Sequence, residues 1–320
     1  MSFAFVFPGQ GSQSVGMLAA LAGSDEVRGA FAEASAVLGF DLWALTQAGP
    51  ESLLNATENT QPAMLCAGVA VWRLWRGRGG AEPLAMAGHS LGEFTALVCA
   101  GALDFGAAVD LVRFRGRIMQ EAVPSGTGAM AAILGLEDAQ VIEACRAAAA
   151  GAVVEAVNFN APGQVVIAGE RAAVGRALEA ARRLGARRAV ELAVSVPSHS
   201  SLMRPAVERF ARKLEGIVLS APRIPCVSAV DAEVHSDAAD LRGLLARQLA
   251  SPVRWRDTVR ALAARGIGQL IECGPGKVLT GLNRRIERPA GLECLSVEDE
   301  PSVAAARAVV GSGGGTHART

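Results

Sequence analysis

The sequence predicts an α/β protein in which a mainly parallel sheet is interrupted by a second, smaller domain. Short apolar runs alternate with longer helical patterns near both ends of the chain, which is typical of strands joined by helices. Between these parts, about 70 residues follow the order βαββαβ, which is the pattern of a ferredoxin-like domain. We therefore expect a discontinuous large domain, 1–126 and 199–310, with a small ferredoxin-like domain inserted at 127–198.

The first part of the chain supplies the first strands and helices of the large domain. Its expected elements are strands at 3–7 and 84–87 and helices at 25–38, 91–100 and 105–122. The strands are expected from short apolar runs, and the helices from apolar residues that recur every three to four positions. Asp104 precedes the third helix, and we expect it to be the N-cap because an aspartate oxygen accepts N–H groups of the first turn.

The order of expected strands and helices changes at Gly128, and the pattern of the large domain returns near residue 200. The small domain is expected to contain the strands GAMAAILGL, VVEAVNF, QVVIAG and RRAVELAVS and helices at 137–150 and 171–184. The large domain then resumes with helices near 201–214, 237–250 and 256–265 and the strand IGQLIEC. A cleft is expected where the two domains join, and ligands usually bind in such clefts. The Gly-rich tail at 311–320 is expected to be disordered.

The composition argues against several classes of protein. The 31 basic residues balance the 31 acidic ones, so neither nucleic acid nor a membrane surface is expected as a partner. The apolar runs are too short to span a bilayer and the N-terminus does not resemble a signal peptide, which predicts a cytoplasmic protein. The six cysteines never form C-x-x-C, so we expect neither a metal site nor a disulfide framework. The chain has no tyrosine, which excludes a tyrosine acid.

The pentapeptide Gly88–His89–Ser90–Leu91–Gly92 matches the G-x-S-x-G pattern of a nucleophile elbow. It follows the apolar run at 84–87 and opens the helical stretch LGEFTALVCA, which is the strand, turn and helix that an elbow requires. There the amide of Leu91 can point at a developing oxyanion. The alternative is an ordinary Gly-rich turn in which Ser90 is only a helix N-cap.

A nucleophilic serine needs a base, and His199 is the histidine best placed to be one. His89 is adjacent to Ser90, but neighbouring side chains on a turn diverge, so we expect it to steady the elbow. His235 lies in a polar stretch and His317 in the tail. His199 follows the last strand of the small domain, in a loop at the domain junction, where functional residues are common. The alternative is a histidine with a purely structural role in that loop.

Arg115 is an unusual cation because it lies in the apolar stripe of the expected helix at 105–122. At 100° per residue, five apolar residues lie on the same side of the helix: Ala108, Leu111, Met119 and Ala122 within about 40° of Arg115, and Ile118 within about 60°. An unpaired buried guanidinium costs several kcal/mol, so Arg115 needs an anionic partner. That partner is either a carboxylate of the protein or a carboxylate of the substrate, which the flat guanidinium fork suits.

A set of motifs, taken in order along the chain, resembles one enzyme family. The motifs are FVFPGQGSQ, NTQPA, GHSLGE, the RG after Phe114, GAMAAILGL, NFNAPGQVVIAG, VPSH and ECGPGKVLTGL. Together they resemble the malonyl-CoA:acyl-carrier-protein transacylases of bacterial fatty-acid synthesis, from residue 3 to about residue 287. The acyltransferase domains of polyketide synthases and the malonyl transferase of malonate decarboxylase look similar. The resemblance implies an α/β-hydrolase-like large domain with a ferredoxin-like small domain.

The resemblance also implies roles for individual residues. Ser90 would be the nucleophile and His199 its base, oriented by the backbone carbonyl of Gln248 in place of an aspartate. The amides of Gln10 and Leu91 would form the oxyanion hole. The residues that the resemblance and the apolar stripe place around the substrate are Arg115 on the malonyl carboxylate, with Gln61, Asn160 and Met119 beside it.

The function that the resemblance implies is a two-step acyl transfer. Malonyl-CoA would acylate the serine, and the phosphopantetheine thiol of acyl carrier protein would then take the malonyl group. We expect no permanently bound cofactor and a monomeric protein. The alternatives are a malonyl transferase that serves the carrier of a malonate decarboxylase, a serine thioesterase or hydrolase, and a carrier-binding subunit without activity.

Overall fold

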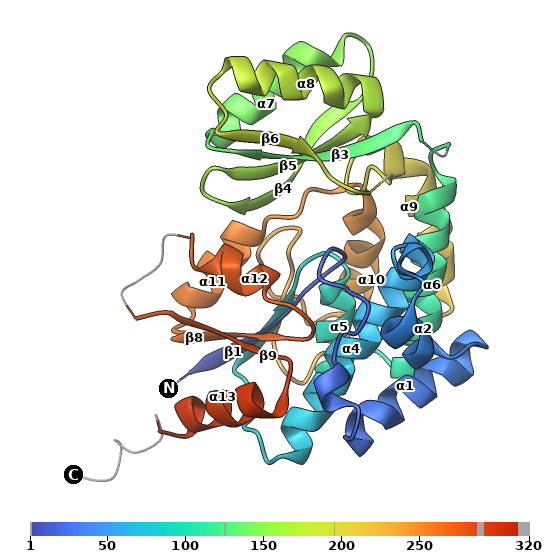
Figure 1. The fold of residues 1–320 in the computed structure, drawn as a ribbon, viewed down its shortest axis with the longest axis vertical. Helices are drawn as coiled ribbons and strands as arrows, with labels where there is room; N and C mark the ends of the chain where they lie inside the picture. The colour runs from blue at the N-terminus through green and yellow to red at the C-terminus, as the bar shows by residue number, and fades with distance from the viewer. Residues whose placement is uncertain (1, 125, 195, 287–290, 313–320) are drawn as a thin grey trace.

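The computed structural model describes residues 2–124, 126–194, 196–286 and 291–312 of the chain, and its larger sheet is parallel (Figure 1). The strand order is β7–β2–β1–β8–β9, and each neighbouring pair is parallel. The strands of this sheet are β1 (Phe3–Phe7), β2 (Ala85–Gly88), β7 (Cys226–Val227), β8 (Gln269–Cys273) and β9 (Glu293–Val297). The prediction of an α/β protein with a mainly parallel sheet is therefore confirmed.

The central strand β1 is buried on both faces, which explains its continuous apolar sequence. Phe3, Phe5 and Phe7 belong to one apolar cluster, and Ala4 and Val6 belong to another on the opposite face. Both faces are therefore covered by helices. Because the strands are parallel, β1 and β2 end at the same edge, where Phe7 pairs with Gly88.

Helices cover the two faces unequally. The cluster on the phenylalanine side includes residues of α1 (Asp25–Leu38), α2 (Leu42–Ala48), α3 (Glu51–Leu54), α4 (Thr57–Gly77), α5 (Gly92–Cys99), α6 (Phe105–Glu121), α9 (Arg204–Glu215), α10 (Ala238–Arg247) and α13 (Glu300–Ser312). The opposite face is covered by α11 (Trp255–Ala264) and α12 (Val278–Asn283). Three short 3-10 turns are η1 (Ala19–Leu21), η2 (Ser201–Met203) and η3 (Gln248–Ala250).

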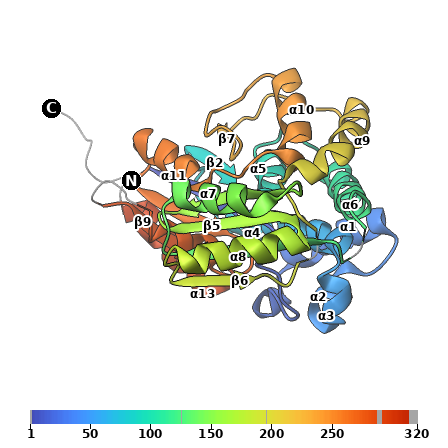
Figure 2. The ribbon, with the colours of Figure 1, turned by 90° about the horizontal axis from the view of Figure 1, so that it is seen from above.

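A smaller antiparallel sheet lies apart from the first, at the top of Figure 1, with strand order β4–β5–β3–β6. Its elements are β3 (Gly128–Leu134), α7 (Asp138–Ala149), β4 (Val154–Ala161), β5 (Gln164–Glu170), α8 (Arg171–Arg183) and β6 (Arg188–Glu191). The predicted order βαββαβ is confirmed, although β6 ends earlier than expected. Helices α7 and α8 pack on one face of this sheet and are nearest the viewer in Figure 2.

The other face of the small sheet turns toward the rest of the molecule. Met130 and Val166 on this face pack near Leu192 and Val194, in the segment that returns to the large sheet. The edge strand β4 is hydrogen-bonded to the segment that precedes α11: the N–H of Val253 donates to the carbonyl of Val157 at 2.8 Å. The space between the two sheets is thus bounded by an apolar wall on the small-sheet side.

Within the described residues, seven helices and strands have no counterpart among the sequence predictions: α2, α3, α4, α12, α13, β7 and β9. Helix α4 contains Pro62, which has no N–H to donate in the helix and breaks the helical sequence pattern. Burial explains why it is nevertheless helical, because most of its residues pack against α1 and α6. Helix α13 extends to Ser312, so the first two residues of the predicted tail are helical, and 313–320 lie outside the described residues.

Along the part of the chain that the structure describes, every helix is too short or too polar to cross a bilayer.

The N-cap of α6 provides a test of the local sequence argument. The Asp104 side chain accepts the N–H of Ala107 at 2.9 Å, as predicted. We expect Asp104→Ala to lower the free energy of unfolding by about 1 kcal/mol, because the first turn loses its acceptor. Urea denaturation measures the change, and Asp104→Asn is the control that keeps a capping oxygen. Equal losses in both variants would contradict the cap.

Candidate active site

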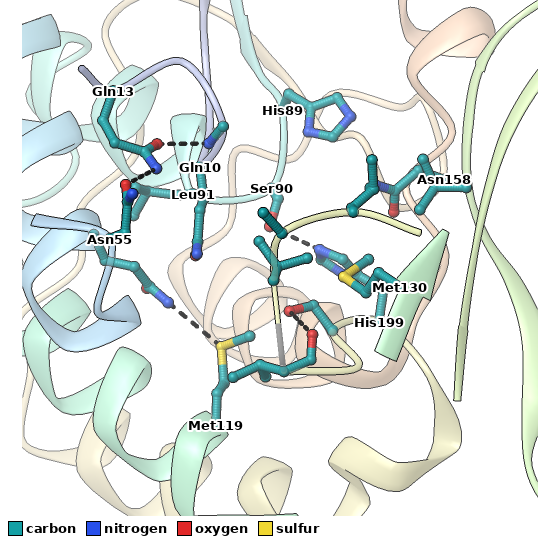
Figure 3. Close-up of a pocket in the computed structure, with 18 of the residues that line it drawn as sticks. Gln10, Gln13, Asn55, His89, Ser90, Leu91, Met119, Met130, Asn158 and His199 are labelled. Atoms are coloured by element: carbon teal, nitrogen blue, oxygen red, sulfur yellow. Dashed lines mark hydrogen bonds between the residues drawn. The ribbon is translucent and has the colours of Figure 1, made fainter. Parts of the chain in front are cut away.

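A cavity of about 370 Å³ lies between the apolar face of the small sheet and the carboxyl ends of β1 and β2. Its wall is formed by residues from both parts of the molecule: Gln10, Gly11, Gln13, Glu51, Asn55, Gln61, His89, Ser90, Leu91, Arg115, Met119, Met130, Asn158, Val166, Leu192, Ala193, Val194, Val196, Ser198 and His199. Figure 3 shows Ser90 at the centre, with Gln10 and Leu91 on one side and His199 on the other. The cleft expected at the domain junction is therefore present.

Ser90 occupies a sharp turn between β2 and α5 that only glycines on both sides permit. Its φ is 51°, a left-handed conformation that is uncommon for residues other than glycine. A Cβ on Gly88 would lie 1.9 Å from the carbonyl carbon of Gly92, and a Cβ on Gly92 would lie 2.0 Å from the carbonyl oxygen of Phe7. The close approach of backbone to backbone lifts the Ser90 hydroxyl into the cavity. Such strain is concentrated at active sites.

His199 lies at hydrogen-bond distance from Ser90, although 109 residues separate them in sequence. Its Nε2 is 2.8 Å from the Ser90 Oγ. Its Nδ1 is 2.9 Å from the carbonyl oxygen of Gln248 and 3.1 Å from that of Ser251. Since a carbonyl only accepts, Nδ1 carries the proton and Nε2 is free to accept the Ser90 proton. The carbonyl of Ser251 is a second orienting group that the sequence analysis missed.

The environment keeps His199 neutral. Burial, followed by the nearby positive charge of Arg115, lowers the pKa of His199 from 6.5 to about 3. The residue has a φ of 67° and is only 4% exposed. A neutral imidazole at the bottom of a cavity can act as a base at ordinary pH without first losing a proton.

His89 turns away from the serine and belongs to the wall behind it. Its Nε2 is 2.9 Å from the Oδ1 of Asn160, and its ring lies 5.6 Å from that of Trp255. The residue therefore has the supporting position expected of it. Asn160, which was expected to line the cleft, is not among the lining residues and instead holds His89 from behind, while Asn158 of the same strand lines the cavity. Regular alternation would put residues 158 and 160 on the same face, but β4 has register shifts between Ala156 and Asn158 and between Phe159 and Ala161, so the sequence pattern did not reveal their different directions.

The amides proposed for the oxyanion hole are available on one side of Ser90. Gln10 follows β1 and Leu91 precedes α5, and both line the cavity. Among the described residues, neither backbone N–H donates to an acceptor of the protein. Leu91 lies at the N-terminus of α5, where the helix leaves amide groups without intrahelical partners. The position suits stabilisation of a negative oxygen.

Arg115 is 1% exposed and reaches the serine from the buried face of α6. Its Nη2 donates to the Ser90 Oγ at 3.3 Å and to the Oε1 of Gln248 at 3.0 Å, and its Nη1 donates to the Oε1 of Gln61 at 3.0 Å. The guanidinium also lies 5.5 Å from the ring centre of Phe94. Its protein partners are therefore neutral oxygens and an aromatic face.

No carboxylate within the described ranges forms an ion pair with Arg115, and its Nε has no hydrogen-bond partner there. Burial lowers the pKa of Arg115 to about 10, which still leaves the group positive near neutral pH. Of the two partners weighed from the sequence, a protein carboxylate is not found in that part of the chain. The cation remains available to an anion that enters the cavity.

Two further residues around Arg115 complete the site. Gln61 bonds to Arg115, and its Nε2 lies 3.5 Å from the sulfur of Met119, which also lines the cavity. Glu93, which sequence reasoning did not single out, is 3% exposed and accepts a hydrogen bond from the Nε2 of Gln248 at 2.6 Å. Burial raises the pKa of Glu93 to about 7. Its position in the apolar stretch LGEFTALVCA is the signal that could have identified it, as it did for Arg115.

A metal site is not found: within the described residues, no group of three histidine, cysteine or carboxylate residues could hold an ion.

The site has the geometry of a serine nucleophile with a histidine base, in an α/β protein with a parallel sheet. Residues 4–292 match the family model described as the acyl transferase domain. The chain belongs to this family.

Individual relatives are similar over nearly the whole chain. The malonyl CoA-acyl carrier protein transacylase of Salmonella typhimurium is 58% identical over 285 residues, which cover 89% of this chain and 92% of that protein. A malonyl-transacylase solved in complex with its type II PKS acyl-carrier protein is 54% identical, with a TM-score of 0.95 over 97% of this chain and 100% of that one. The transacylase of Coxiella burnetii is 48% identical, with a TM-score of 0.94 over 96% and 97% of the two chains.

The protonation state of His199 is directly testable. We expect nitrogen NMR of the labelled histidine rings to find His199 neutral down to about pH 5, because its pKa is about 3. The unfolded chain binds this proton near pH 6.5, so His199 lowers folding stability as the pH falls from about 6.5 to about 3. A His199→Gln variant assigns the signal. A His199 ring that is charged at pH 6 would contradict the environment described above.

Proposed function

We propose that the protein is an acyltransferase that moves a malonyl group from CoA to the phosphopantetheine thiol of an acyl carrier protein through a malonyl ester on Ser90. The observation that carries the proposal is a buried guanidinium that forms no ion pair with a carboxylate in the described part of the chain and lies 3.3 Å from the hydroxyl that attacks. The relatives that bear this activity in their names support the substrate and the carrier.

The first half of the reaction acylates the serine. The Nε2 of His199 takes the proton of Ser90 while the serine oxygen attacks the thioester carbonyl of malonyl-CoA. The amides of Gln10 and Leu91 donate to the oxyanion, and a donor of this kind is typically worth about 3 kcal/mol in the transition state. The tetrahedral intermediate collapses, the carbon–sulfur bond breaks, and the His199 imidazolium protonates the departing CoA sulfur.

The second half returns the enzyme to its starting state. The carrier's phosphopantetheine thiol gives its proton to His199 and attacks the carbonyl of the malonyl ester. The same two amides stabilise the second oxyanion. When the ester bond breaks, the Ser90 oxygen recovers the proton from His199, and the malonyl group leaves as the thioester of the carrier. No step needs a metal or a permanently bound cofactor.

Arg115 explains why the acyl group is malonyl. The free carboxylate of this group can reach a guanidinium whose other donors are held by Gln61 and Gln248. Because these partners are neutral, the substrate brings the first full negative charge that pairs with the cation. A charge-assisted pair in a desolvated site is stronger than one exposed to water.

The environment of His199 favours transfer over hydrolysis. Its Nδ1 faces two carbonyl oxygens, where a serine hydrolase would have a carboxylate. A thiol attacks the ester readily without that carboxylate, whereas water needs a stronger base. Turnover of malonyl-CoA without an acceptor separates a thioesterase from a transferase, and assays with the two kinds of carrier separate fatty-acid synthesis from a malonate decarboxylase.

We assign the two sheets to an α/β-hydrolase-like core and a ferredoxin-like small domain, with the boundaries predicted above. The small-sheet order β4–β5–β3–β6 and the placement of Ser90 after a parallel strand support the assignment. A monomeric state and a cytoplasmic location stay predictions.

The nucleophile is tested by the covalent intermediate. We expect intact-mass measurement to detect one malonyl adduct after the protein is mixed with malonyl-CoA, and Ser90→Ala to abolish it because the Ser90 hydroxyl is the one that His199 contacts at 2.8 Å. Peptide mapping of the wild-type adduct locates the residue. An adduct that persists in Ser90→Ala would refute the assignment.

Arg115 is tested by selectivity. We expect Arg115→Ala to reduce transfer of malonyl by about 100-fold or more while acetyl transfer changes little, because an acetyl group has no carboxylate to pair. Steady-state rates with malonyl-CoA and acetyl-CoA provide the measurement. The matched control is Arg113→Ala, which removes an arginine of the same helix that donates to the carbonyl of Leu38, away from the cavity. Equal losses for the two substrates would make the role of Arg115 structural.

A further inference from the structure

One residue, Gln248, contacts the base, the cation and the nucleophile of the site. The backbone carbonyl of Gln248 accepts from His199, and its Oε1 accepts from Arg115. Its Nε2 donates to the backbone carbonyl of Ser90 at 3.2 Å and to the Oε2 of Glu93 at 2.6 Å. The orientation of the side-chain amide therefore bears on the cation and on the backbone of the nucleophile, while the base is oriented by the backbone of the same residue.

Glu93 is a buried carboxylate that the reaction described above does not use. It lies in the first turn of α5, three residues after Ser90, and does not line the cavity. The side chain of Ser228 and the backbone of Ala229 also lower the pKa of Glu93, against the larger effect of burial. Burial of an ionised carboxylate costs folding free energy unless hydrogen bonds or opposite charges compensate, so its presence here calls for a physical explanation.

The hydrogen bonds make the orientation of the Gln248 amide unambiguous. An amide has an oxygen end that only accepts and a nitrogen end that only donates. Arg115 offers only donors, so it requires the oxygen, and Glu93 requires the nitrogen when ionised. Both neighbours therefore favour the same orientation of the Gln248 amide, with its oxygen toward Arg115 and its nitrogen toward Glu93. Without Glu93, the amide could rotate and present its N–H group to the guanidinium, which would displace Arg115 or weaken its alignment.

The interposed amide also keeps the guanidinium available. A carboxylate in direct contact with Arg115 would occupy its donors and neutralise the charge that the substrate carboxylate needs. Glu93 instead acts at one remove: its charge favours the protonated form of Arg115, while Gln248 occupies the hydrogen-bonding site on Nη2. Glu93 thus stabilises the positive charge of Arg115 without forming an ion pair that would neutralise it.

We infer that Glu93 is a positioning residue that, through the Gln248 amide, holds the Arg115 guanidinium in the orientation that receives the carboxylate of the acyl group. The inference rests on the proposed function and deepens it, because it assigns substrate selectivity to a residue outside the cavity wall. Glu93 touches neither substrate nor reacting atoms, so we expect its effect to appear in selectivity and to pass mainly through the Gln248 amide.

The test compares kcat/KM for malonyl-CoA and acetyl-CoA in Glu93→Ala and Glu93→Gln. We expect Glu93→Ala to lower the malonyl-to-acetyl ratio tenfold or more, chiefly through KM for malonyl-CoA. Glu93→Gln keeps an oxygen that can accept from Gln248, so its ratio should stay within about threefold of wild type. A Gln variant as damaged as the Ala variant would overturn the orienting role.

A double-mutant cycle tests the path through Gln248. Gln248→Met removes both ends of the amide but keeps the carbonyl that orients His199, so we expect it also to lower the ratio about tenfold. In this background, Glu93→Ala should change the ratio by less than twofold, because the group it acts on is gone. Additive effects would overturn the inference. If Glu93→Ala does not fold, an unchanged ratio in Gln248→Met alone overturns it.

The matched control is another buried glutamate. Glu272 is 1% exposed and caps α12 by accepting the N–H groups of Leu279 and Thr280 at 3.0 and 2.7 Å, outside the cavity. Glu272→Ala should lower stability and leave the malonyl-to-acetyl ratio unchanged. If Glu93→Ala behaves in the same way, its role is structural and the inference fails. Absence of a malonyl adduct on wild-type Ser90 would instead refute the proposed function.

Discussion

The rest of the site depends on a buried positive charge that forms no ion pair with any carboxylate of the described residues. Arg115 is held by the oxygens of Gln61, Gln248 and Ser90 and by the face of Phe94. These contacts satisfy most of its donors but do not neutralise it, and an isolated buried ion costs several kcal/mol. The buried charge of Arg115 is therefore unfavourable in the empty site, and a carboxylate that enters the cavity pairs with it and relieves this cost. The same charge helps to keep the neighbouring His199 neutral, so it favours both substrate binding and the basic form of the histidine.

The nucleophile and its base share a second constraint, which is backbone strain. Ser90 and His199 both have positive φ, and each is stabilised by its surroundings: Ser90 by the packing of Gly88 and Gly92, and His199 by hydrogen bonds to the 248–251 segment. Such conformations persist only where the surrounding structure compensates for their cost. The large parallel sheet provides the rigid edge, and the segment that leaves the small sheet brings His199 back to that edge. The two-part fold is thus what aligns a serine and a histidine from distant parts of the chain.

Where apolar residues recur with a clear helix or strand period, the local sequence was sufficient to predict the element. The bounds predicted for β1 and α1 agree with the structure, and Asp104 caps α6 as expected. Helix α4 was missed because Pro62 interrupts its pattern, and the short strand β7 carries too few residues to produce one. In the site, Asn160 was misplaced because the register of β4 shifts around it, which a regular strand pattern does not reveal. Glu93 and the carbonyl of Ser251 were missed because their importance comes from contacts with segments about 50 or more residues away.

The sequence alone determined the elbow, the histidine that could serve it and the buried arginine, because each of these follows from short-range rules: glycine sterics, elimination among few histidines and the period of a helix. The tertiary structure decided what these groups do to one another. Whether Arg115 meets a protein carboxylate, which face of β4 reaches the cavity and which way the Gln248 amide points all depend on side chains brought together from distant segments. Charge pairing and amide orientation act over a few ångströms in space, and no spacing along the chain encodes that distance.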